Sequence, residues 1–175
     1  MFTVFDDLEQ QAEGLHLVER DAEVADLTAA EYSGISLGAR LHASLGLELR
    51  VRLVGGHQVS GRLARAGDDW LLLVDRSAEW IVRHDGIAGV TGLSPRADSE
   101  ETWTVMDRLT LRTVLRRLCG VGSGCLVHLV DDQQVGGRVG RVGRDFFELH
   151  VGEGPERSVQ VVPVSAVSAL QGRPE

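Results

Sequence analysis

Apolar and polar residues alternate along two stretches of the chain that have nearly the same sequence. Residues 51–73 read VRLVGGHQVSGRLARAGDDWLLL, and residues 127–149 read VHLVDDQQVGGRVGRVGRDFFEL. Eleven of the 23 aligned positions are identical, whereas roughly one or two would match by chance in a chain of this composition. This similarity at an offset of 76 residues predicts an internal repeat whose two copies fold alike.

Each copy is expected to contain five short strands, because apolar residues recur at every second position and turn residues separate the runs. Glycines at 55–56 and aspartates at 131–132 mark the first hairpin turns. The match resumes after a four-residue insertion between the third and fourth strands of the second copy. The expected strands are 49–53, 59–63, 70–74, 79–83 and 87–93 in the first copy, and 127–129, 135–139, 146–151, 158–162 and 167–170 in the second.

A short helix is expected before each set of strands. Ser36 and Thr110 are suitable N-cap residues, and leucines follow them at helical spacing. Gly46 and Gly120 are placed to end these helices. One helix followed by five short strands is typical of a small, strongly bent barrel.

The predicted fold is therefore mainly β with helices (α+β): two tandem five-stranded bent barrels, each preceded by a short helix, plus an N-terminal helix. Residues 1–30 are expected to form this acidic amphipathic helix, 31–94 the first barrel unit, 95–102 a polar linker and 103–172 the second unit. The apolar stripe of the N-terminal helix can pack on its own barrels or contact another chain. The candidate partner-binding residues on this stripe are Phe5, Leu8, Leu15 and Val18.

Two segments of the first copy resemble the motifs of Sm and Hfq proteins. The pattern V-x-L-x-x-G-x-x-V-x-G-x-L in residues 51–63 is similar to the first Sm motif, and residues 82–87 (VRHDGI) are similar to the second. The whole chain also resembles a group of uncharacterised actinobacterial proteins with an acidic leader and two such units. The resemblance implies two tandem Sm-like barrels and raises the possibility of RNA as a ligand.

In RNA-binding Sm proteins a loop aromatic residue and an asparagine hold one base, and an arginine of the second motif braces it. Trp70 and Arg83 stand at the aromatic and arginine positions, but two aspartates occupy the loop and no asparagine is present. Pro163 replaces the arginine in the second copy. We therefore expect at most one incomplete RNA site, with Trp70 and Phe146 serving as core aromatic residues of the third strand.

Surface arginines are the other candidates for RNA contact, because a guanidinium group can bind phosphate through paired hydrogen bonds. They can equally pair with carboxylates or cover apolar surface with their stems. Their repetition in both copies keeps both alternatives open. These candidates are Arg62, Arg65, Arg138, Arg141 and Arg144.

Charge and composition favour a protein partner over nucleic acid. The net charge is −8, and residues 1–35 carry nine carboxylates against one arginine, whereas nucleic-acid-binding proteins usually present a basic surface. DNA is unexpected because no helix-turn-helix with basic recognition residues can be placed. We expect a protein partner or self-association through free strand edges, with weak RNA binding through an arginine-bearing face as the alternative.

Catalytic chemistry is not expected, because the histidines are scattered and no nucleophile stands near a base. The glycine-rich segments lack the lysine and serine of a P-loop, so neither a cofactor nor a metal is predicted. Two cysteines are too few for a disulfide framework. With no apolar run long enough to cross a bilayer and no leader sequence, the chain is expected to be cytoplasmic, without a membrane partner.

Overall fold

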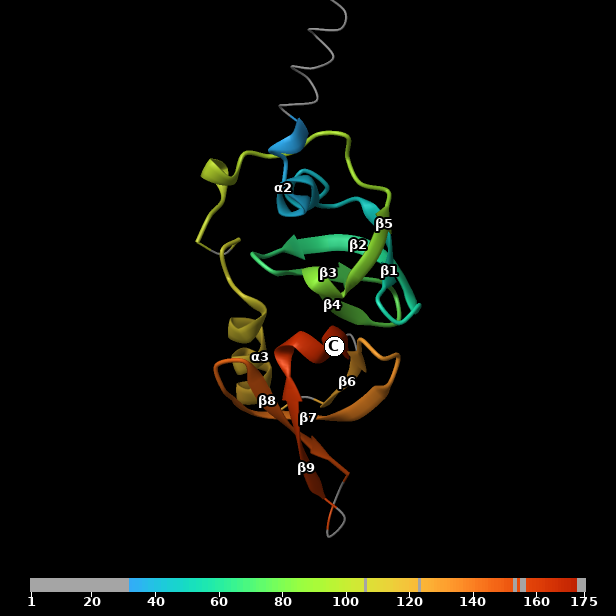
Figure 1. Ribbon diagram of the computed structural model, residues 1–175, viewed down its shortest axis with the longest axis vertical. Coiled ribbons are helices and arrows are strands. Elements are labelled where there is room, and N and C mark those ends of the chain that lie inside the picture. The colour runs from blue at the N-terminus through green and yellow to red at the C-terminus, as the bar shows by residue number, and fades with distance from the viewer. Residues whose placement is uncertain (1–31, 106, 123, 153, 155–156, 173–175) are drawn as a thin grey trace, which may run out of the picture. The chain divides into compact units, whose positions relative to one another are not determined.

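The fold is described from a computed structural model that covers residues 32–105, 107–122, 124–152, 154 and 157–172 (Figure 1). The described residues from Leu37 onward form one compact unit. The expected N-terminal helix lies outside the described residues, together with Phe5, Leu8, Leu15 and Val18.

The compact unit contains the same order of elements twice: an α-helix, four strands, a short 3-10 turn and a fifth strand. The first copy consists of α2 (Leu37–His42), β1 (Glu48–Leu53), β2 (Gln58–Ala66), β3 (Trp70–Val74), β4 (Glu79–Arg83), η1 (His84–Gly86) and β5 (Ile87–Thr91). The second consists of α3 (Leu111–Val121), β6 (Gly124–Leu129), β7 (Gln134–Val142), β8 (Phe146–Val151), β9 (Ser158–Pro163), η4 (Val164–Ala166) and β10 (Val167–Gly172). A further 3-10 turn, η2 (Glu100–Thr102), lies between the copies.

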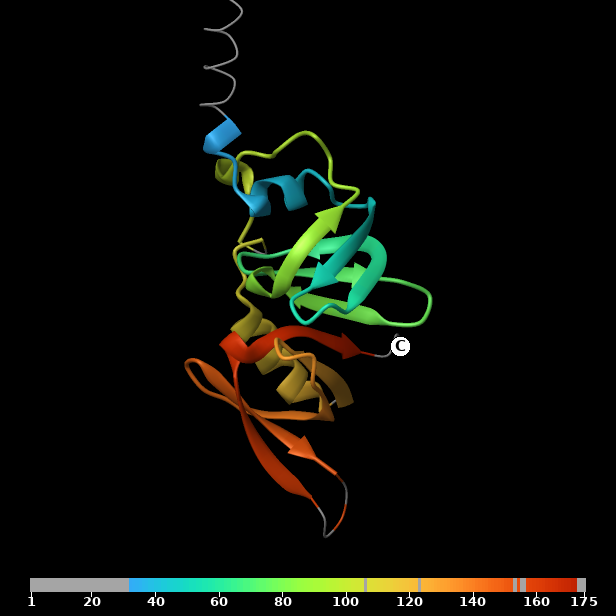
Figure 2. The ribbon, with the colours of Figure 1, turned by 45° about the vertical axis from the view of Figure 1, so that its right-hand side comes forward.

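The prediction of two closed barrels is wrong. All ten strands belong to one open antiparallel sheet with the order β5-β1-β2-β3-β4-β10-β6-β7-β8-β9. A closed five-stranded barrel would have to use the outer edge of β4 within its own copy, but β4 pairs instead with β10 of the other copy. Figure 2 shows β10 lying beside the strands of the first copy. The fold is therefore a mostly β structure with two α-helices in the described part of the chain.

Strand pairing follows the same register in both copies. Val51 lies opposite Val59 in β1 and β2, and Val127 lies opposite Val135 in β6 and β7. The fifth strand returns beside the first in each copy, with a register shift at the same place. The third and fourth strands also pair alike. The four inserted residues lengthen β8 and β9 by one residue each and the loop between them by two.

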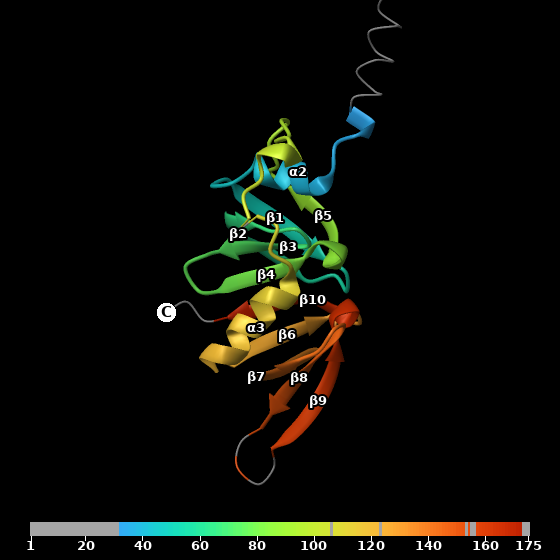
Figure 3. The same ribbon diagram turned by 90° about the vertical axis from the view of Figure 1, so that its left-hand side faces the viewer.

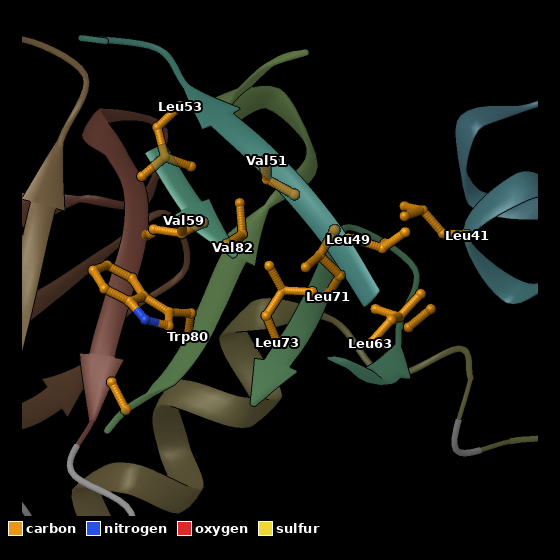
Figure 4. Packing of buried hydrophobic residues seen from close by; sticks show 13 residues of the cluster. Leu41, Leu49, Val51, Leu53, Val59, Leu63, Leu71, Leu73, Trp80 and Val82 are labelled. Atoms are coloured by element: carbon orange, nitrogen blue, oxygen red, sulfur yellow. The ribbon is translucent and has the colours of Figure 1, made fainter. Parts of the chain in front are cut away.

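The first hydrophobic core fills the space between α2 and strands β1 to β4. Every second residue is buried along β1, and along β2 as far as Leu63. Figure 4 shows Leu41 reaching from α2 toward Leu49 and Leu63. Leu41 and Leu63 are fully buried, and burying a side chain of this size contributes about 1.5–3 kcal/mol.

A second core lies under α3, which packs against β7 (Figure 3). Leu111 and Leu115 of the helix meet Phe147 and Leu149 of β8, and all four are fully buried. Each core also takes a residue from the other copy: Ala169 of β10 enters the first, and Trp70 of β3 enters the second. The two copies therefore share their hydrophobic cores as well as their sheet.

Candidate functional site at the sheet edges

The pairing of β4 with β10 is the junction between the two copies. The paired stretch begins with Val82 opposite Ala169 and extends to Gly172. Strand edges carry unpaired N–H and C=O groups, and this pairing satisfies them within the protein. The backbones also meet closely beside the junction, since a Cβ atom added to Gly86 would come within 2.6 Å of Ser168.

Arg83 reinforces this junction with its guanidinium group. Nε donates a hydrogen bond of 2.7 Å to the carbonyl oxygen of Val167, and Nη2 donates one of 2.9 Å to that of Ser165. Nη1 forms an ion pair of 2.7 Å with Asp85. Only 11% of the Arg83 side chain is exposed. The residue that the Sm resemblance assigns to a base is thus bound to the other copy's backbone.

The turn between β2 and β3 holds the start of α3. The indole Nε1 of Trp70 donates a hydrogen bond of 2.7 Å to the carbonyl oxygen of Leu109. A carboxylate oxygen of Asp69 accepts the backbone N–H of Leu111 at 2.6 Å. Thr110 occupies the expected N-cap position, but its side chain makes no capping bond. Asp69 supplies that bond from the other copy, and a negative charge at a helix N-terminus is favourable.

One apolar face of β3 and β4 is covered by the second copy. Trp70 is buried in the second core, and Leu72 and Ile81 pack against that core from the same side. Two of the equivalent positions on β8 and β9 are uncovered: Phe146 is 38% exposed and Val161 is 59% exposed. The third is Glu148, which is paired with Arg141. The expectation that both aromatic residues lie in the core is therefore confirmed for Trp70 and wrong for Phe146.

Two strand edges remain without a neighbour in the sheet of described residues. They belong to β5 and β9, the first and last strands in the sheet order. Neither strand carries a charged side chain. Val159 and Val161 of β9 are both exposed. Uncharged edges with exposed apolar side chains are the kind that pair with another chain.

The candidate arginines do not converge on one surface site. Arg141 forms a two-bonded ion pair with Glu148, at 2.7 and 3.0 Å. This ion pair lowers the pKa of the Glu148 carboxyl and raises that of Arg141. In β1 and β2, Arg62 lies opposite Glu48. Arg144 is exposed beside the turn before β8.

Two of the candidates, Arg65 and Trp70, line one groove together with Arg117 of α3, and its volume is about 410 Å³. The Trp70 ring is buried there, and its N–H is bound to Leu109. Stacking of a base on this ring would require the second core to open. The geometry therefore gives no support to an RNA site built on Trp70 and Arg83.

A larger cavity of about 990 Å³ is open on the second copy, and its lining includes Arg138, His150 and Cys125. Burial raises the pKa of the Cys125 thiol to about 11. A thiol with this pKa is protonated at neutral pH and is a poor nucleophile. Among the described residues, no group of three or more His, Cys, Asp or Glu side chains is arranged to bind a metal ion.

No protein-family model matches the chain, and no curated protein is similar to it. Within the described residues, no helix has the length and apolar character needed to cross a membrane. The sequence predicts only a loop position for Asp69, and the signal that could have marked its role is its identity with Asp145 in the second copy.

Proposed function

We propose that this protein is a non-enzymatic assembly module that joins further copies of itself through its free sheet edges. The β4–β10 junction carries the proposal, because it is an example of the required contact within the chain itself. By the repeat, β9 corresponds to β4, and β5 corresponds to β10. The free edge of β9 is therefore of the type that pairs with the free edge of β5.

The β4–β10 junction within the chain supplies the register for such a contact between protein molecules. Val162 of one protein molecule would lie opposite Gly89 of the next molecule, and Val161 would lie opposite Val90. Val161 would then face the first core of the next molecule, as Ile81 faces the second core within one chain. Phe146 would enter the same interface at the position that corresponds to Trp70. The exposed apolar residues of β8 and β9 would be removed from water, which favours association.

A contact between two protein molecules would be weaker than the β4–β10 junction within one chain. Pro163 stands at the position of Arg83 and has no guanidinium group to bond the neighbouring carbonyls. Pro163 also lacks a backbone N–H, but it lies just outside the stretch that would pair, since internal pairing starts at Val82. The association is therefore reversible and depends on protein concentration.

Light scattering coupled to size-exclusion chromatography over a range of concentrations tests the proposal. The wild-type protein should shift from monomer to larger species as concentration rises. Val161→Lys should remain monomeric, because a lysine charge on the β9 edge opposes pairing. Val121→Lys is the matched control, since Val121 is 70% exposed on α3, away from both edges.

A wild-type protein that stays monomeric at every concentration would overturn self-association, as would equal behaviour of the two lysine variants. The same measurement with oligouridine RNA distinguishes the alternative function. Assembly that appears only with RNA would favour an RNA-binding role. A cytoplasmic location is part of the proposal, supported by the two free cysteines, Cys119 and Cys125.

A further inference from the structure

Three aromatic rings meet where the two copies join. His57 precedes β2, Trp80 lies on β4, and His128 lies on β6. The centroids of the His57 and His128 rings are 5.0 Å apart, and the Trp80 ring lies 5.0 Å from His128 and 5.6 Å from His57. Two imidazole rings from different copies thus face each other against a single indole.

The surroundings of these rings disfavour a positive charge. His128 and Trp80 are buried, and the void beside the two histidines is too small for a water molecule. The side chain of Gln171 on β10 is hydrogen-bonded to the His128 ring at 3.4 Å. The bond from Gln171 and the carboxylate of Asp132, in the turn after β6, favour the charged form of His128, while burial and His57 oppose it.

We propose that the junction between β4 and β10 is a pH-sensitive contact, which weakens when His128, whose ring faces His57 of the other copy, takes up a proton. A charge on the His128 ring would be buried, with no room for a water molecule beside it. Acid conditions should therefore loosen the pairing of β4 with β10 before the rest of the sheet. This junction lies within one chain, so its pH dependence does not require association between protein molecules.

The direction of the effect follows from the pKa of His128. Burial is the main cause that lowers this pKa, and the neighbouring His57 adds to it. The unfolded chain therefore binds a proton first as the pH falls below the ordinary histidine value of about 6.5. Stability at the junction is lost from that pH downward, until the folded protein also becomes protonated. Each unit of difference between the two pKa values corresponds to a tenfold change in the opening equilibrium.

Hydrogen exchange of backbone amides in β4 and β10 measures this opening, after correction for the intrinsic effect of pH on exchange. Between pH 8 and pH 5, protection of these amides should fall in the wild-type protein. It should fall much less in His128→Gln, which keeps a polar side chain but cannot titrate. His150→Gln is the control, because His150 lies on β8, outside the cluster, and this variant should behave as the wild type does.

Proton NMR of the histidine rings gives a second readout that needs no variant at position 128. The His128 ring should titrate with a midpoint below about 6.5, and His57→Gln should raise that midpoint, because one opposing charge is removed. An ordinary midpoint for His128 in the folded protein would overturn the inference. Equal loss of protection in the wild type and His128→Gln would overturn it as well.

Discussion

Replacement of Arg83 by methionine tests whether this arginine holds the two copies together. Methionine keeps most of the stem and removes three hydrogen-bonded contacts, to Val167, Ser165 and Asp85. Val167 is fully buried, so loss of a charged donor to its carbonyl should cost about 1.5–3 kcal/mol. Ser165 and Asp85 are exposed, and their bonds add less than about 1 kcal/mol each.

The expected destabilisation of Arg83→Met is therefore about 2–4 kcal/mol, measured by urea unfolding followed by circular dichroism at neutral pH. Arg141→Met is the matched control. Arg141 also makes a short ion pair, but its side chain is 87% exposed, so its loss should destabilise the fold much less than the loss of Arg83.

Equal stability of the two methionine variants would refute the role given to Arg83 at the junction. The comparison also bears on RNA. If Arg83 only braced a base, its replacement would weaken RNA binding and leave the free energy of unfolding unchanged. If Arg83 holds the junction, its replacement lowers the free energy of unfolding in the absence of RNA.

Three further predictions concern individual side chains. Asp69→Ala should destabilise the fold by about 1 kcal/mol and should speed amide exchange in the first turn of α3; unchanged exchange there would contradict the capping role. Phe147→Ala should cost about 3–5 kcal/mol in urea unfolding, because Phe147 is fully buried in the second core; a cost below 1 kcal/mol would be inconsistent with that packing. In a Cys119→Ser background, Cys125 should react with iodoacetamide at pH 8 far more slowly in the folded than in the urea-unfolded protein, because its pKa is raised to about 11; equal rates would contradict its burial.

The strands and short helices could be predicted because their signals are local. Alternation of apolar residues depends on the period of a strand, and the leucines of α3 recur at the period of a helix. Because the same pattern occurs in both copies, the strands predicted in one copy supported those predicted in the other. Closure of the barrels could not be predicted in this way, because it depends on which strand edges meet across the whole chain.

The difference between Trp70 and Phe146 shows the same limit at the level of single residues. The two occupy equivalent positions, yet only Trp70 is covered by a following helix, since α3 comes after the first copy and within the described residues no helix follows the second. Equivalent sequence positions therefore have different surroundings at the ends of a repeat. The role of Arg83 was missed for a related reason, because its partners, Val167 and Ser165, lie more than 80 residues along the chain.

The position of β10 in the chain has a consequence for biosynthesis. β10 is the last of the described strands in chain order, and it supplies the neighbour for both β4 and β6. A nascent chain on the ribosome can complete β1 to β5 early, but the edge of β4 stays open until β10 has emerged. Contacts between such distant segments form slowly, and uncovered edges favour aggregation during that delay. A premature stop anywhere before residue 167 would make the exposed β4 edge permanent, so even a short C-terminal truncation should be recovered mainly in the insoluble fraction.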